Sequence, residues 1–282
     1  MKKAFKDYFG SNGFWGLALH HYTLLNEGDI TGNARGYATD FNESEWFLTM
    51  ARSLAMDDLV RKHGAIMDKY DPGRQAALVI DEWGCFHNQE KGTDPALPFQ
   101  QNSLMNALAA GIQLNVFNNY AERIRMSNLA QTINIVHSLI LTEGSSMILT
   151  PTYHVFDLYK AHQDAIKLPL SVECENYTLS GNSVPALNIS ASMAEDYRIH
   201  ILFCNLDPNK EMKTTIETPG FMAESVSGQI VSSGSMQDHN TVNKPELVKT
   251  EDYNDAVLSK RADRTIITLS IPAKSVTMLE IS

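Results

Sequence analysis

The chain has 282 residues, of which 43% are hydrophobic and 20% are charged, as in ordinary soluble globular proteins. Its net charge of −10 disfavours a sequence-independent grip on nucleic acid and binding to an anionic membrane surface. No stretch approaches the roughly 18 apolar residues of a membrane span, and no apolar segment behind the basic N-terminus makes it a signal peptide.

The three cysteines, Cys85, Cys174 and Cys204, are odd in number and far apart. This pattern indicates reduced thiols of a cytoplasmic protein and argues against a disulfide framework or a zinc site. Cys85 has no accompanying base, so we expect it to pack in the core. His154 and His162 lie eight residues apart, and we expect them on a packed or solvated helix face, not around a metal.

The first part of the chain is predicted to alternate strands and helices. We expect the end of a helix at residues 1–9, a buried strand at 14–19 that ends in His20-His21-Tyr22-Thr23, and a helix from Asn42 or Ser44 to about Tyr70. A strand before Asp81, a helix at 100–120 and a short strand at 123–126 are expected to follow. The last two elements are an apolar helix at 132–141 and a helix from Thr150-Pro151 to about His162.

One of these strands stands out, because residues 76–80 are apolar without alternation and are followed by Asp81, Glu82 and Trp83. Such a run suits a parallel strand that is buried on both faces. In α/β barrels the C-terminal ends of the strands carry the catalytic residues. The two carboxylates could therefore supply a nucleophile or base, or they could simply cap a helix or pair with an arginine.

After Leu168 short alternating runs separated by turn residues replace the long helices, which is typical of an antiparallel sandwich. The runs lie at residues 186–190, 197–204, 213–218, 225–232, 265–271 and 275–281. We place the boundary near residues 163–170, with one domain at 1–165 and another at 166–282. The first holds three βα units, and a barrel needs eight. We therefore expect the chain to be the C-terminal portion of a larger protein.

Four blocks together resemble the family 51 glycoside hydrolases, the α-L-arabinofuranosidases. They are Leu19-His20-His21-Tyr22-Thr23, Val79-Ile80-Asp81-Glu82-Trp83, residues 107–131 with Leu114-Asn115-Val116-Phe117-Asn118 and Arg123-Ile124-Arg125-Met126, and Leu149-Thr150-Pro151-Thr152-Tyr153-His154-Val155-Phe156. The resemblance covers nearly the whole chain and is strongest over residues 14–165.

The resemblance implies the last three βα units of a (β/α)8 TIM barrel, from strand six onward, followed by a jelly-roll-type β-sandwich. It implies a retaining enzyme that needs no cofactor, forms homo-oligomers at full length, and releases terminal α-L-arabinofuranosyl groups from arabinan, arabinoxylan and their oligosaccharides. Glu82 falls on the nucleophile of the family. His20, Tyr22, Trp83 and Gln131 are the expected substrate-binding residues.

The chemistry suits these residue types, because a phenol such as Tyr22 can donate a hydrogen bond that keeps a nucleophilic carboxylate ionised. Gln131 could hold a sugar hydroxyl independently of pH. Other readings stay open: Tyr22 could be an ordinary half-buried aromatic residue, and Gln131 could cap the following helix. Only one of His20 and His21 is expected to face the site, since strand neighbours point to opposite faces.

The acid/base glutamate of the family lies in an Asn-Glu pair at the end of strand four, a region that this chain does not contain. Neither Asn26-Glu27 nor Asn42-Glu43 follows a buried strand, so neither is expected to replace it. Without general acid catalysis roughly 10²–10⁴-fold in rate is lost. We expect the chain alone to have little activity and to associate through exposed edges unless an N-terminal half complements it.

Two other functions stay open. The chain could be a non-catalytic barrel remnant and sandwich that binds carbohydrate or supports assembly. It could also belong to a related retaining glycosidase that acts on xylosides or glucosides.

Overall fold

A computed structural model describes residues 14–25, 35–94 and 96–282, so the helix end predicted at residues 1–9 lies outside the described part. Three parallel strands form a sheet in the order β1-β2-β3: β1 (Gly16–Thr23), β2 (Ala77–Cys85) and β3 (Ile124–Leu129). Residues 77–80 of the central strand β2 are buried, as its apolar run predicts. The edge strand β1 is a strand as expected, but it is mostly only partly buried.

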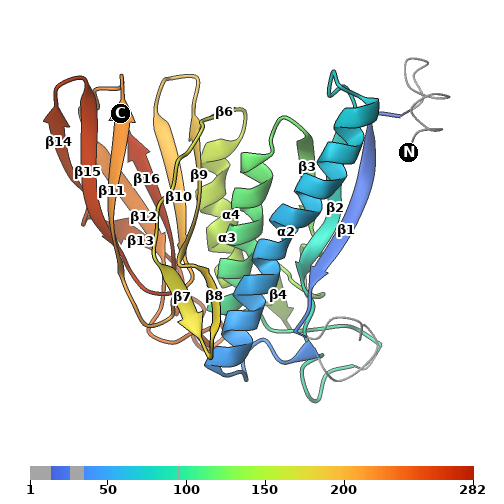
Figure 1. Cartoon of the computed structure of the whole chain (residues 1–282). Coiled ribbons are helices and arrows are strands. Elements are labelled where there is room, and N and C mark those ends of the chain that lie inside the picture. Colours follow the sequence, from blue (N-terminus) through green and yellow to red (C-terminus); the bar gives the residue numbers. More distant parts are fainter. Residues whose placement is uncertain (1–13, 26–34, 95) are drawn as a thin grey trace.

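Three helices lie between this sheet and the antiparallel sheets (Figure 1): α2 (Glu43–Tyr70), α3 (Leu104–Asn119) and α4 (Pro151–Tyr159). The side-chain oxygen of Asn42 accepts the N–H groups of Ser44 and Glu45, and the Glu45 carboxylate accepts the N–H of Asn42. This capping box fixes the start of α2 at Asn42. Helix α4 begins at Pro151 as predicted and continues as a 3-10 turn over Lys160–His162.

The helix predicted at residues 132–141 is wrong. The segment is irregular and leads into a hairpin of β4 (Ile140–Glu143) and β5 (Ser146–Leu149). Asn134 and Val136 have φ angles of 61° and 52°, which a right-handed helix cannot contain. The Asn134 amide instead bonds the hydroxyl and the N–H of Thr142, each at 2.7 Å. The hydrogen bonds between Asn134 and Thr142 hold this segment in an irregular conformation in place of a helix.

The remaining strands are antiparallel, and all six runs predicted after Leu168 form strands. A six-stranded sheet has the order β13 (Thr250–Tyr253), β12 (Val226–Val231), β16 (Ser275–Ile281), β10 (Ile199–Asn205), β9 (Leu187–Met193) and β6 (Ile166–Lys167). A second sheet has the order β11 (Met212–Pro219), β15 (Arg264–Ile271) and β14 (Val257–Arg261), and β7 (Asn176–Leu179) pairs with β8 (Asn182–Pro185). The short strands β7, β8, β13 and β14 were not predicted.

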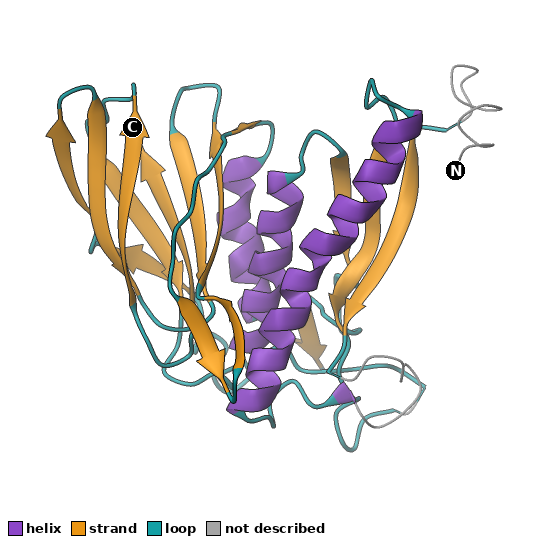
Figure 2. Cartoon of the chain, in the orientation of Figure 1, coloured by secondary structure: helices purple, strands orange, loops and turns teal. Residues whose placement is uncertain are grey.

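Figure 2 shows the helices as a layer between the strands of the parallel sheet and those of the antiparallel sheets. The buried hydrophobic residues fall into two clusters. The larger joins helix residues such as Trp46 and Leu108 to residues of both large antiparallel sheets, including Phe203 and Ile267. The smaller joins the helices to the parallel sheet around Trp83. Within the described ranges no helix is long and apolar enough to cross a membrane.

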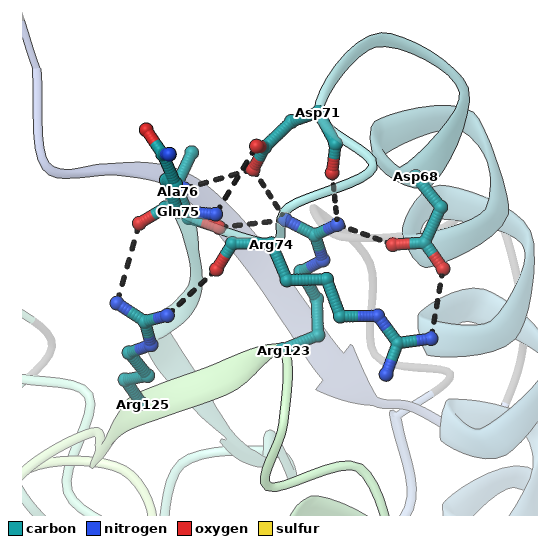
Figure 3. Close-up of polar contacts among 7 residues, drawn as sticks. All are labelled: Asp68, Asp71, Arg74, Gln75, Ala76, Arg123 and Arg125. Carbon is teal, nitrogen blue, oxygen red and sulfur yellow. Dashed lines mark hydrogen bonds and ion pairs between the residues drawn. The ribbon is translucent and has the colours of Figure 1, made fainter.

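The N-terminal ends of β2 and β3 are held by a buried guanidinium (Figure 3). Arg123 donates to Asp71 Oδ2 at 2.8 Å, to the carbonyl of Ala76 at 2.8 Å and to the Asp68 carboxylate. Asp71 also accepts the N–H groups of Gln75 and Ala76. This network joins the N-terminal ends of β2 and β3, at the end of the sheet opposite to Glu82, and we assign it a role in the stability of the fold.

Candidate functional site

The polar residues at the C-terminal ends of β1 and β2 come together. The Tyr22 hydroxyl donates to Oε1 of Glu82 at 2.5 Å. His20 Nε2 lies 3.0 Å from Asp81 Oδ1, and its Nδ1 lies 3.5 Å from Glu82 Oε2. The expected contact between Tyr22 and Glu82 is therefore present, and His20 is the member of the histidine pair that meets both carboxylates.

An extra residue in β2 explains how two neighbouring carboxylates reach one histidine. Ala18 pairs with Val79 and His20 pairs with Glu82, so two steps along β1 match three along β2. A bulge of this kind redirects side chains and is common beside active sites. In a regular strand Asp81 and Glu82 would point to opposite faces.

Trp83 does not join these residues, which corrects the expectation that it contacts substrate. Its side chain is fully buried, with its ring 5.1 Å from that of Phe117 and stacked 6.0 Å from that of Phe156. It packs with the helices that cover the sheet. Trp83 therefore stabilises the strand that carries Glu82.

Gln131 borders the same opening as the carboxylates. A cleft of about 540 Å³ is lined by Asp81, Glu82 and residues 129–133, which follow β3. The N–H of Ala130 donates to the carbonyl of Trp83 at 2.9 Å, which holds this segment beside β2. Since residues 132–141 form no helix, Gln131 caps none, and its exposed side chain is available to a ligand.

His137 contacts the strand that carries Glu82. The sequence did not point to this residue, because it lies in the segment that was predicted to be a helix. Its Nδ1 accepts the N–H of Cys85 at 3.0 Å, and its Nε2 lies 2.9 Å from the Thr152 hydroxyl. Burial lowers the pKa of His137 to about 3, so the ring is neutral and Nε2 carries the proton. A Cβ at Gly84, whose φ is +146°, would lie 2.9 Å from His137 Cβ. Glycine is therefore needed where β2 passes this ring.

Two further residues, Phe86 and Arg35, extend the contacts of Tyr22, and the sequence analysis did not single them out. The ring of Phe86 lies 5.4 Å from that of Tyr22, and the Arg35 guanidinium lies 4.1 Å from the centre of the Phe86 ring. An aromatic residue four positions after Glu82 was the available sequence signal. Phe86 packs against the ring of Tyr22 and restricts it.

Electrostatics favour a neutral Tyr22. Burial, followed by the hydrogen bond and the charge of Glu82, raises the pKa of Tyr22 well above its ordinary value. The phenol therefore stays a donor throughout the physiological range. Burial also raises the pKa of the Cys85 thiol to about 12, in keeping with a packing role, and all three cysteines are free.

The other sequence candidates lie elsewhere. Asn42-Glu43 begins α2, where the Glu43 carboxylate accepts bonds from Tyr177 and Asn209 and not from the site. Asn26-Glu27 lies outside the described residues. In the part of the chain that the structure describes, no three His, Cys, Asp or Glu side chains are grouped to hold a metal ion.

Comparison with known proteins shows which family this chain resembles. Residues 81–275 match the family model described as the α-L-arabinofuranosidase C-terminal domain. The chain is 38% identical over 269 residues to a protein of Bacteroides ovatus named intracellular exo-alpha-L-arabinofuranosidase, covering 94% of this chain and 50% of that protein.

Solved structures agree. The GH51 arabinofuranosidase from Xanthomonas axonopodis pv. citri superimposes with a TM-score of 0.91 at 37% identity, over 100% of this chain and 55% of that one. A family 51 α-L-arabinofuranosidase from Bifidobacterium longum, at 18% identity and a TM-score of 0.73, shares the fold over 96% of this chain and 53% of its own. The chain thus spans about half the length of the relatives it matches.

Proposed function

The chain belongs to the family 51 α-L-arabinofuranosidases and corresponds to their C-terminal portion, and from this premise we propose that it carries the nucleophile of a retaining glycosidase. The substrate is a terminal α-L-arabinofuranosyl group of arabinan, arabinoxylan or their oligosaccharides. The observation that supports this most strongly is the 2.5 Å bond from Tyr22 to Glu82 at the edge of an open cleft.

Glu82 attacks the anomeric carbon and forms a glycosyl-enzyme intermediate, which water then hydrolyses. Tyr22 donates to Oε1, so Oε2 is the oxygen that attacks. Two side chains orient the carboxylate: Tyr22 donates to Oε1 at 2.5 Å, and His20 Nδ1 lies 3.5 Å from Oε2. Gln131, across the cleft, binds a sugar hydroxyl.

The second carboxylate comes from outside this chain. A retaining glycosidase needs an acid/base group about 5–5.5 Å from the nucleophile. Asp81 is the other carboxylate that lines the cleft among the described residues, but it lies next to Glu82 on the same strand, β2, and contacts His20. An N-terminal half that completes a (β/α)8 barrel supplies the acid/base group from strand four and covers the edges of β1 and β3.

The finer architecture belongs to the same proposal. Residues 1–165 form the last three βα units of the barrel, and residues 166–282 form a jelly-roll-type β-sandwich. The assembled protein is cytoplasmic, works without a cofactor and forms homo-oligomers. The reduced thiols and the word "intracellular" in the name of the Bacteroides ovatus relative support this location.

The test is covalent labelling of Glu82. The chain is mixed with an N-terminal half taken from a relative, treated with a mechanism-based arabinofuranosyl inhibitor, digested and mapped by mass spectrometry. We expect the label on Glu82 and little hydrolysis of an aryl arabinofuranoside by the chain alone. Rapid turnover by the unmixed chain would contradict the need for a second half. A xylosyl or glucosyl inhibitor that labels faster would favour a related glycosidase.

A further inference from the structure

A second cleft, of about 450 Å³, lies beyond the β4–β5 hairpin and plays no part in the chemistry at Glu82. Its walls are the hairpin at Met147 and Leu149, the first turns of α4 at Tyr153, and the loop before β13 at Glu246. This volume falls within the range of small-molecule sites. In Figure 1, β4 appears at the same end of the molecule as the C-terminal ends of β1 and β2.

The two clefts share one rigid segment. Ile133 lines the first cleft and forms a bridge to Ile140, whose strand pairs with Leu149 in the second. The N–H of Ile140 donates to the carbonyl of Thr132 at 3.0 Å. The linings of the two clefts are therefore connected through the pairings of Ile133 with Ile140 and of Ile140 with Leu149.

A buried amide fixes the walls of the second cleft relative to each other. Asn240, which is 1% exposed, donates to the carbonyls of Leu149 and Val248 at 2.8 Å each and accepts the N–H of Val248 at 2.8 Å. One side chain thus ties the hairpin to the loop before β13. The cleft is preformed, as binding sites usually are.

The lining combines an apolar surface with polar groups. Met147 is 65% exposed, and the rings of Tyr153 and His154 meet nearly at right angles with centres 5.6 Å apart. The side chains of Tyr153 and His154 are both partly buried and bring a hydroxyl and an imidazole to the lining. Burial lowers the pKa of His154, so its ring is neutral at pH 7.

The carboxylates of the cleft are each paired with a lysine. Asp157 pairs with Lys160 at 2.5 Å and Glu246 pairs with Lys249 at 3.0 Å, so the described lining offers an anionic ligand no free cation. Carboxylates and a neutral imidazole accept bonds from hydroxyl groups, and aromatic rings and a thioether pack against the C–H faces of sugar rings. A neutral glycan has both kinds of surface.

We propose that the cleft bounded by Met147, Tyr153, His154 and Glu246 is a secondary site for the neutral polysaccharide whose branches or ends reach Glu82. It holds sugar units remote from the scissile bond, and so it raises affinity for polymer without affecting small aryl glycosides. This inference rests on the proposed function for the choice of ligand, but the binding itself needs no turnover.

Electrophoresis of the full chain in native gels that contain soluble debranched arabinan tests the site. We expect the wild type to be retarded and Tyr153→Ala to bind at least about fivefold more weakly. The matched control is Tyr197→Ala, which removes a tyrosine that is 72% exposed on the turn between β9 and β10. Anionic polygalacturonate in the gel should retard none of them.

Unchanged retardation of Tyr153→Ala, or a wild type that arabinan does not retard, would overturn the secondary site. Labelling of Glu82 separates this result from the proposed function. A retarded chain with an unlabelled Glu82 would overturn the proposed function while supporting the cleft. A labelled Glu82 in a chain that arabinan does not retard would overturn the cleft alone.

Discussion

The Tyr22 hydroxyl and the Glu82 carboxylate, 60 positions apart in the chain, are joined by a hydrogen bond of 2.5 Å where β1 and β2 end. The bond occupies Oε1, and the other oxygen, Oε2, lies 3.5 Å from His20 Nδ1. Tyr22 and His20 together therefore set the orientation of the carboxylate that borders the cleft.

Tyr22→Phe removes this donor and keeps the ring against Phe86. In the complemented enzyme we expect labelling of Glu82 to slow about tenfold, the lower end for a bond to a charged group because the site is partly exposed. Tyr153→Phe is the control, and an unchanged labelling rate for Tyr22→Phe would contradict the role of the bond.

Arg123→Met tests the network at the opposite edge of the sheet. The substitution leaves Asp71, which is 4% exposed, without its guanidinium partner, and we expect a loss of about 3–5 kcal/mol in the free energy of unfolding. The control is Arg125→Met, which removes an exposed guanidinium that donates only to the carbonyls of Arg74 and Gln75. Urea unfolding followed by fluorescence measures both, and equal effects would contradict the argument.

The pH dependence of stability should show two windows. Burial lowers the pKa of His137 to about 3 and those of His87 and His162 to about 4, from an ordinary 6.5. Below pH 6.5 the unfolded chain therefore binds more protons than the folded one, and stability falls as the pH drops toward 4. Replacing His137 with Gln should flatten part of this slope in urea midpoints measured from pH 7 to 4.

The second window belongs to Asp71. Burial opposes its ionisation, but the Ala76 N–H, the Arg123 guanidinium and the Gln75 N–H outweigh that effect and hold its pKa below the ordinary value. Its contribution is complete above about pH 4 and is lost as the pH falls further through the folded pKa. Arg123→Met should lose most of the decline below pH 4, and a decline equal to that of the wild type would contradict this assignment.

Trp83→Ala should behave as a core mutation. Removal of a fully buried indole is expected to cost about 3–5 kcal/mol of stability. Trp15→Ala is the matched control, because that side chain is 55% exposed and the Trp15 carbonyl can still accept the N–H of Ala77. A stable Trp83→Ala protein with weakened sugar binding would restore the substrate role that its buried position argues against.

Features that depend on neighbouring residues could be predicted from the sequence, and those that depend on distant ones could not. The apolar run before Asp81 and the Asn42 cap are local, and both β2 and the start of α2 follow them. The Asn134 bond to Thr142 and the hairpin it supports involve residues eight apart, so the apolar composition of 132–141 suggested a helix. The bulge that brings Asp81 and Glu82 to His20 depends on pairing with both neighbouring strands.

The most direct measurement is the site of covalent labelling in the complemented enzyme, with Glu82→Gln and Asp81→Asn compared side by side. The account predicts that the arabinofuranosyl label is carried by the peptide containing Glu82, that Glu82→Gln abolishes it, and that Asp81→Asn retains it. A label on Asp81, or full labelling of Glu82→Gln, would contradict the assignment of Glu82 as the nucleophile.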